Sequence, residues 1–323
     1  MSDISSTIKS IELDDKQAVK LSLFVESLPD ILLKLENPEY DEIFGYRINT
    51  TDKPHVDENI RNEILLKFLV ADNYDLKLAE ERLIKTLNWR NKFQPLHAAF
   101  AEKFDDELNE LGSITNFTSA KPNLHVTTWN LYGNLKNPKT IFQKFGGGDD
   151  DDDTESTSLP GNQFLRWRIG MMEQALQLLD FSNSELNKIA QIQDTNNVSM
   201  FSIDPGMKQG MKDIIQIFGE NYPELLSVKF FINVPYIMGW VFTFFKTIRL
   251  ISEETLKKFQ VLNHGDLGEF YPKSDLPKNY GGENDQSIFD IDIGNTIKLN
   301  SYGQVMLANT RDKKLEDNDT EVE

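Results

Sequence analysis

The chain of 323 residues contains no cysteine, which excludes disulfides, thiol nucleophiles and zinc–thiolate sites. It is also poor in basic residues, with 34 Lys and Arg against 52 Asp and Glu, and its formal net charge is −18. This balance argues against nucleic acid as a partner, because a basic excess is needed to replace the counterions of the phosphates.

Targeting and catalytic motifs are lacking as well. Residues 1–16 have no apolar segment of the kind that a signal peptide needs, so we expect a cytoplasmic protein. The Gly-x-Ser-x-Gly, His-Glu-x-x-His and GxGxxG patterns do not occur, and the four histidines are scattered singly. The sequence therefore predicts a binding protein rather than an enzyme.

An uncharged run at residues 230–245 holds five phenylalanines, a tyrosine and a tryptophan. It is too short for a membrane span, which takes about 20 apolar residues, and Pro235 and Gly239 interrupt it. We expect a strand buried on both faces at 227–234, followed by a helix at 236–250. Because that helix has almost no polar face, it is either a core helix or the lining of a lipid-sized pocket.

Apolar residues recur at helical spacing in the first 110 residues, at 16–35, 56–70 and 76–93, with Asp75 as the N-cap of the last segment. Arg82, Arg90 and Lys92 fall on its polar side, which we interpret as a solvated helix face. Further along, strands and helices alternate, which favours βαβ units and a largely parallel sheet. The strands are expected at 124–132, 198–203, 228–234 and 259–262, and the helices at 164–179 and 208–218.

Two segments are compositionally distinct. Residues 146–161 join three glycines, five aspartates and a Thr/Ser stretch, which predicts an exposed acidic insertion. Beyond about residue 285 the chain turns polar, and 313–323 is typical of a disordered acidic tail.

Several motifs resemble, in their order along the chain, the CRAL-TRIO (Sec-fourteen-like) lipid-binding family. They are residues 65–71 with Trp89-Arg90, Tyr222-Pro223-Glu224 with Asn233-Val234-Pro235 and Phe244-Phe245-Lys246, and Asn279-Tyr280-Gly281-Gly282 after Leu276-Pro277. The chain is most similar to the fungal subgroup of the fifth Sec-fourteen homologue of yeast, through residues 128–133, 166–170 and 178–181. The resemblance implies an α/β fold with a helical N-terminal subdomain at 1–115, a lipid-binding domain at 116–285 and a polar segment at 286–323.

In function, the resemblance implies a phosphatidylinositol-binding and transfer protein of the cytoplasm and of the cytosolic side of the endoplasmic reticulum membrane. The family associates Glu224 and Lys258 with the inositol headgroup. A gate helix at 237–250 would contact the membrane surface, with Lys246 and Arg249 facing anionic lipids. Val70 departs from the family pattern, since an arginine often stands at its position.

The same subgroup includes a haem-binding member, so haem b is an alternative ligand. There the iron is held by a tyrosine in a His-Asp-Tyr motif, where this chain has Gln193-Asp194-Thr195 just before the expected strand 198–203. Both expected iron ligands are therefore missing, and no metal ligand is predicted. Three other haem-contacting positions are retained and fit a propionate or a phosphate, namely Tyr132, Arg168 and Lys229.

A third alternative is a regulatory interaction module, in which the acidic insertion and the acidic tail bind partners. Deletion of the insertion would separate this alternative from the two ligand-binding ones.

Overall fold

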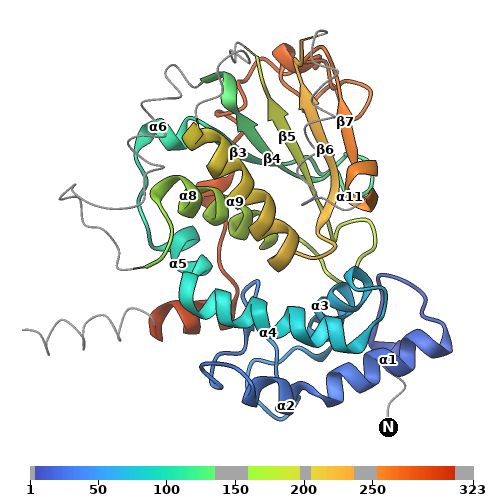
Figure 1. Ribbon diagram of the computed structural model, residues 1–323. Coiled ribbons are helices and arrows are strands. Elements are labelled where there is room, and N and C mark those ends of the chain that lie inside the picture. The colour runs from blue at the N-terminus through green and yellow to red at the C-terminus, as the bar shows by residue number, and fades with distance from the viewer. Residues whose placement is uncertain (1–3, 135–158, 197–204, 236–252, 310–323) are drawn as a thin grey trace, which may run out of the picture.

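A five-stranded sheet stands beside a helical N-terminal unit in the computed structural model, which describes residues 4–134, 159–196, 205–235 and 253–309 (Figure 1). The strand order is β3-β4-β5-β6-β7, and only β3 is antiparallel to its neighbour. The strands are β3 (Gly112–Asn116), β4 (Val126–Leu131), β5 (Ile189–Asp194), β6 (Leu226–Ile232) and β7 (Phe259–Val261).

The N-terminal unit confirms the predicted helices. They are α1 (Asp15–Glu26), α2 (Leu28–Leu33), α3 (Glu58–Ala71) and α4 (Leu76–Phe93), followed by the short α5 (Pro95–Phe100) and α6 (Asp106–Asn109). The predicted segment 16–35 forms two helices because the first ends at Ser27 and Pro29 lies in the first turn of the second. Asp75 caps α4 as predicted, accepting a hydrogen bond from the backbone nitrogen of Leu78 at 3.1 Å. A small hairpin, β1 (Glu42–Ile43) with β2 (Tyr46–Arg47), completes the unit.

Arg90 was predicted on a solvated helix face, and this prediction is wrong. Its side chain is completely buried, between the carboxylates of Glu42 at 2.9 Å and Glu173 at 2.6 Å. The hydroxyls of Tyr40 and Tyr222 donate to the same two carboxylates, at 2.8 and 2.6 Å. The error has a physical reason: a charge on a helix indicates solvent only where no opposite charge from another element faces it.

Predicted strands 124–132, 228–234 and 259–262 are confirmed as β4, β6 and β7, and the predicted helices 164–179 and 208–218 as α8 (Gln163–Leu176) and α9 (Pro205–Asn221). The predicted strand 198–203 lies outside the described residues. β3 and β5 were missed, and β5 is the middle strand of the sheet. β6, predicted to be buried on both faces, is fourth of five, and only its last three residues are buried.

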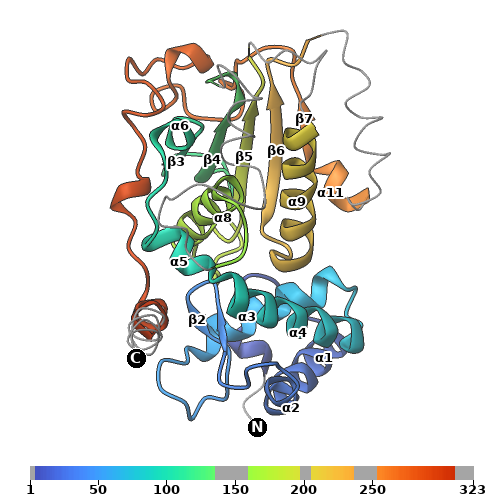
Figure 2. The ribbon, with the colours of Figure 1, turned by 60° about the vertical axis from the view of Figure 1, so that its left-hand side comes forward.

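The two faces of the sheet are covered differently. α8 and α9 lie against one face (Figures 1 and 2). The opposite face is strongly apolar and packs against residues 267–291 of the C-terminal part, with Trp129, Ile192 and Phe230 at its centre. The polar side chains of the sheet are therefore expected on the face under α8 and α9.

The C-terminal segment does more than form a polar tail. Its Asp292 carboxylate accepts a hydrogen bond from the Ile114 backbone nitrogen at 2.6 Å, and the Ile293 nitrogen donates to the Ile114 carbonyl at 2.9 Å. The chain then runs down to the helical unit, where the Tyr302 hydroxyl bonds to Asp41 (Figure 2). Residues 288–296 thus lie along the free edge of β3, while 310–323 lie outside the described residues.

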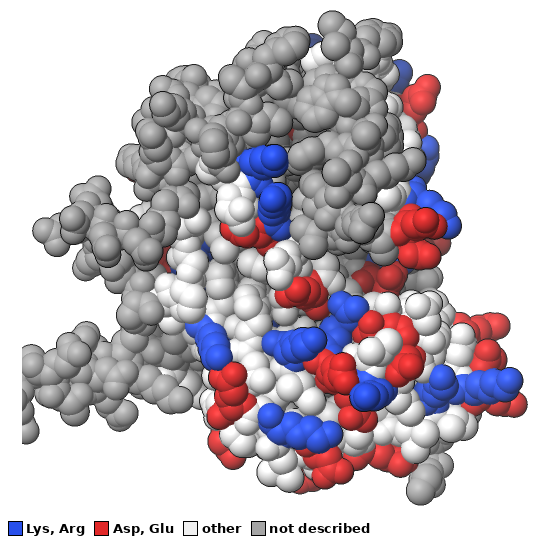
Figure 3. Space-filling model, viewed as in Figure 1, with Lys and Arg blue, Asp and Glu red and all other residues white. Residues whose placement is uncertain are grey.

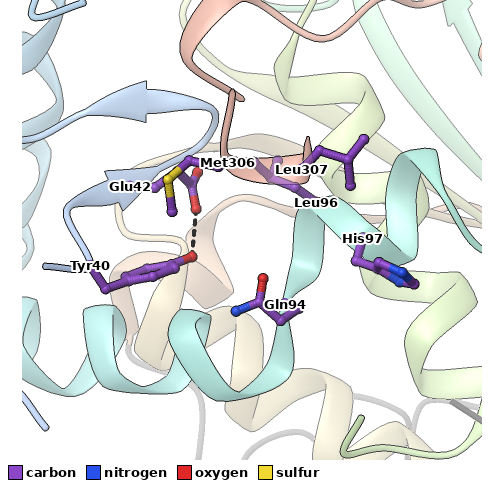
Figure 4. Close-up of a pocket in the computed structure, with 7 residues that line it drawn as sticks. All are labelled: Tyr40, Glu42, Gln94, Leu96, His97, Met306 and Leu307. Carbon is purple, nitrogen blue, oxygen red and sulfur yellow. Dashed lines mark hydrogen bonds between the residues drawn. The ribbon is translucent and has the colours of Figure 1, made fainter. Parts of the chain in front are cut away.

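A small pocket lies where residues 301–309 meet α5 (Figure 4). Its cavity volume is about 10 Å³, which is about enough for one water molecule and far too small for an organic ligand. We therefore place the candidate site elsewhere. The residues that line this pocket are Tyr40, Glu42, Gln94, Leu96, His97, Met306 and Leu307.

Candidate functional site

Glu224 and Lys258, both predicted from the resemblance, meet at the amino ends of the parallel strands. Glu224 lies just before β6 and Lys258 just before β7, and parallel strands bring such positions to one edge of the sheet. The Lys258 Nζ lies 3.5 Å from the Glu224 carboxylate. Glu224 has a φ of +53°, a left-handed conformation that a non-glycine residue adopts at a cost. The surrounding contacts must therefore hold this turn in place.

Lys67 of α3 supplies such contacts, a role that no pattern in the sequence indicated. Its side chain is almost completely buried, and its Nζ donates to the carbonyls of Asn187 at 3.1 Å and Glu224 at 3.2 Å. Burial lowers the pKa of Lys67 to about 7, and the charge of Lys188 acts in the same direction. Lys67 thus ties the helical unit to the two turns that precede β5 and β6.

A second group of polar side chains lies on the sheet face beneath α8. The strand register places Thr128 beside Gln191, Asn130 beside Gln193, and Gln191 beside Lys229. Within the described part of the chain, Thr128 Oγ1, Asn130 Oδ1 and Gln193 Nε2 are buried without a hydrogen-bond partner. Because buried polar atoms are normally paired, this face is suited to a ligand with polar groups.

Tyr132, Arg168 and Lys229, also predicted as a set, are brought together here. Arg168 is buried, hydrogen-bonds to Tyr132, and leaves its Nη1 without a partner among the described residues. Loss of contact with water, and after it the charge of the nearby Arg168, lower the pKa of Lys229 to about 7. No carboxylate of the described residues offsets these two cations. The pair is therefore suited to an anionic group.

The position expected for iron ligation lies at the end of a strand that was not predicted. Gln193 and Asp194 are the last two residues of β5. Asp194 is held by the Asn233 amide at 2.8 Å and the Tyr280 hydroxyl at 3.0 Å. The Thr195 hydroxyl donates to the Ile232 carbonyl at 3.0 Å. The side chains of Asp194 and Thr195 therefore hold the ends of the strands together. Of the three residues, only Gln193 lies among the polar side chains on the sheet face beneath α8.

The described residues contain neither a cluster of metal ligands nor a membrane-spanning helix. No group of three or more His, Asp or Glu is placed to hold a metal ion. No described helix has both the length and the apolar character needed to cross a bilayer. The predicted gate helix 237–250, with Lys246 and Arg249, lies outside the described residues.

The fold and these two polar groups define a member of the CRAL/TRIO family, and residues 129–282 match the CRAL/TRIO domain. A relative from Candida albicans, named phosphatidylinositol transfer protein SFH5, is 64% identical over 99% of this chain and 98% of its own length. The protein of that name from Scheffersomyces stipitis is 57% identical over 99% and 96%. This chain therefore belongs to the CRAL/TRIO family.

A solved structure gives the same result for the fold. The crystal structure of Sfh5 matches this chain with a TM-score of 0.82 and 32% sequence identity, covering 93% of this chain and 98% of its own. The predicted α/β class with a mainly parallel sheet is confirmed. The predicted domain boundaries at 115/116 and 285/286 stay predictions. β3 spans the first of these boundaries and belongs to the sheet.

Proposed function

We propose that this protein binds phosphatidylinositol and transfers it between membranes. The observation that carries the proposal is the Glu224–Lys258 pair, with 3.5 Å between carboxylate and ammonium at one edge of the sheet. An ammonium meets a phosphate as a compact charge, and a carboxylate accepts hydrogen bonds from inositol hydroxyls. The names of the relatives describe transfer and not catalysis, in agreement with the prediction that this chain is not an enzyme.

Transfer of this kind needs no bond-making. Hiding acyl chains from water contributes about 0.8 kcal/mol for each buried CH₂, which removes the main barrier to carrying a lipid through water. We further propose peripheral contact with the cytosolic side of the endoplasmic reticulum membrane, made by the segment 237–250. The family resemblance and the aromatic composition of that segment support this part.

The test is extraction of labelled phosphatidylinositol from vesicles by the Glu224→Gln and Lys258→Met variants. We expect each to lower extraction about 10-fold or more, since a hydrogen bond to a charged group contributes about 1.5–3 kcal/mol. Lys278→Met is the matched control, because this lysine is exposed and paired with Asp285 at the surface. Transfer that survives the double change at the wild-type rate would show that the headgroup lies elsewhere.

Haem b in the same interior is a second candidate, favoured by one observation: Arg168 is a buried cation and Lys229 a partly buried one, and neither has a carboxylate partner in the described part of the chain. They fit the acidic groups of haem. The residues at the iron do not fit, because Gln193 and Thr195 offer an amide and a hydroxyl where histidine, cysteine, methionine or tyrosine is usual. An absorbance spectrum of the purified protein decides, since a Soret band would require another axial ligand.

A further inference from the structure

Lys188 lies beside the candidate headgroup site, and the proposed function assigns no role to it. It directly precedes β5, as Glu224 and Lys258 precede β6 and β7. Its backbone nitrogen donates to the Asn123 side chain at 3.0 Å, which fixes the start of the strand. Its side chain is only partly exposed. The charges of Lys258 and Glu224 both act on it, so the three groups share one edge of the sheet.

The charges at this edge do not balance. Lys67, Lys188 and Lys258 act on one another, and Glu224 is the carboxylate that acts on both Lys67 and Lys188. Glu63 also acts on Lys67, but its oxygens accept from the backbone nitrogens of Lys9 and Ser10 and from the Ser10 hydroxyl, at 2.5–2.9 Å. The described residues therefore leave an excess of positive charge.

The three ammonium groups are not equivalent. Lys67 is directed at two carbonyls, and Lys258 at Glu224. No hydrogen bond or ion pair within the described residues engages the Lys188 ammonium. Phosphatidylinositol brings a single negative charge with its phosphodiester, which Lys258 can meet. A ligand must carry a second anionic group if the Lys188 ammonium is also to meet a negative charge.

We propose that Lys188 binds a phosphomonoester on the inositol ring, so that this site takes phosphorylated inositol lipids as well as phosphatidylinositol itself. The inference rests on the proposed function, because it places the ring between Glu224 and the lysines. A phosphomonoester carries about −1.5 to −2 charges near neutral pH and offers strong acceptor oxygens. It is the group that matches a partly desolvated lysine beside a second one.

The test compares extraction of phosphatidylinositol and of phosphatidylinositol 4-phosphate from phosphatidylcholine vesicles by full-length protein. We expect Lys188→Met to lower extraction of the phosphorylated lipid about 10-fold, and that of phosphatidylinositol less than about 2-fold. Lys188→Arg is expected to restore most of the loss, since it keeps the charge. Thermal unfolding of both variants without lipid shows whether the fold is intact.

General attraction to anionic vesicles needs its own control, because the helical unit carries Lys and Arg interspersed with Asp and Glu (Figure 3). Lys257→Met is this control, since Lys257 is an exposed lysine of α11 (Glu253–Lys257) next to Lys258, and its replacement removes the same charge. We expect it to change extraction of neither lipid. An equal loss in Lys257→Met and Lys188→Met would overturn the proposal.

The remaining outcomes distinguish failure of the Lys188 inference from failure of the proposed transfer function. If Lys188→Met leaves both lipids unchanged, or lowers both equally, the inference fails and the transfer function stands. If the wild-type protein extracts neither lipid, the proposed function fails as well. Soluble inositol 1,4-bisphosphate that competes at the same concentration as the lipid would point to a soluble phosphate ligand and overturn the lipid assignment.

Discussion

Replacement of Arg90 by methionine is expected to lower the free energy of unfolding by about 3–5 kcal/mol, the usual cost of removing one partner from a buried ion pair. Arg90 lies completely buried between Glu42 and Glu173, so the change would leave two carboxylates in the interior without their counter-charge. Tyr40 and Tyr222 would continue to donate to them, but a hydroxyl cannot offset a full charge. Urea denaturation measures the loss.

Lys92→Met is the matched control, because it makes the same kind of change two positions along the same helix. Lys92 pairs with Glu36 at 2.7 Å, and both side chains are more than half exposed. Such surface pairs contribute about 0–1 kcal/mol. If the two variants lost equal stability, Arg90 would have no special place in the interior network.

The second large effect is expected from Gly282→Ala, in the turn that closes the family's sequence signature. An added Cβ would lie 1.7 Å from the Leu276 carbonyl oxygen and 2.4 Å from its carbon. Backbone atoms cannot move aside as a flexible side chain does, so we expect a loss of about 3 kcal/mol or more in the free energy of unfolding. The Tyr280 hydroxyl, which bonds to Asp194, would be displaced with the turn.

Gly219→Ala provides the comparison. This glycine lies in α9, and an added Cβ there meets no atom within 4 Å. Alanine is the better helix former, and a gain of about 0.5–1 kcal/mol is expected. Chemical denaturation of the two variants measures both changes in the free energy of unfolding, a loss for Gly282→Ala and a gain for Gly219→Ala. A neutral Gly282→Ala would mean that the turn between Leu276 and Gly282 adapts at little cost.

The fold was predictable where the sequence pattern agrees with the environment. β4 and β6 carry the aromatic and β-branched residues that mark strands. β5 does not, because its sequence IAQIQD buries Gln191 and Gln193 toward the polar face of the sheet. Sequence patterns presume that buried means apolar, so a strand that lines a polar interior escapes them.

The candidate site was predictable only as far as the resemblance reaches. Glu224 and Lys258 stand 34 positions apart, and their 3.5 Å contact depends on the parallel pairing of β6 with β7. Lys67 and Lys188 lie still farther away in the sequence and belong to no motif of titratable residues. Only the register of the strands and the packing of α3 against two turns bring these charges together.

The C-terminal segment also bears on how the protein is made. Tyr302 bonds to Asp41 across 261 positions, and Asp292 covers the edge of β3. A ribosome releases the helical unit and β3 long before these residues exist, so a growing chain carries an open strand edge until residue 292 has been added. Open edges pair with other chains. A message broken before the codon of residue 292 would thus yield a product inclined to self-associate, whereas a chain that includes this segment covers the edge itself.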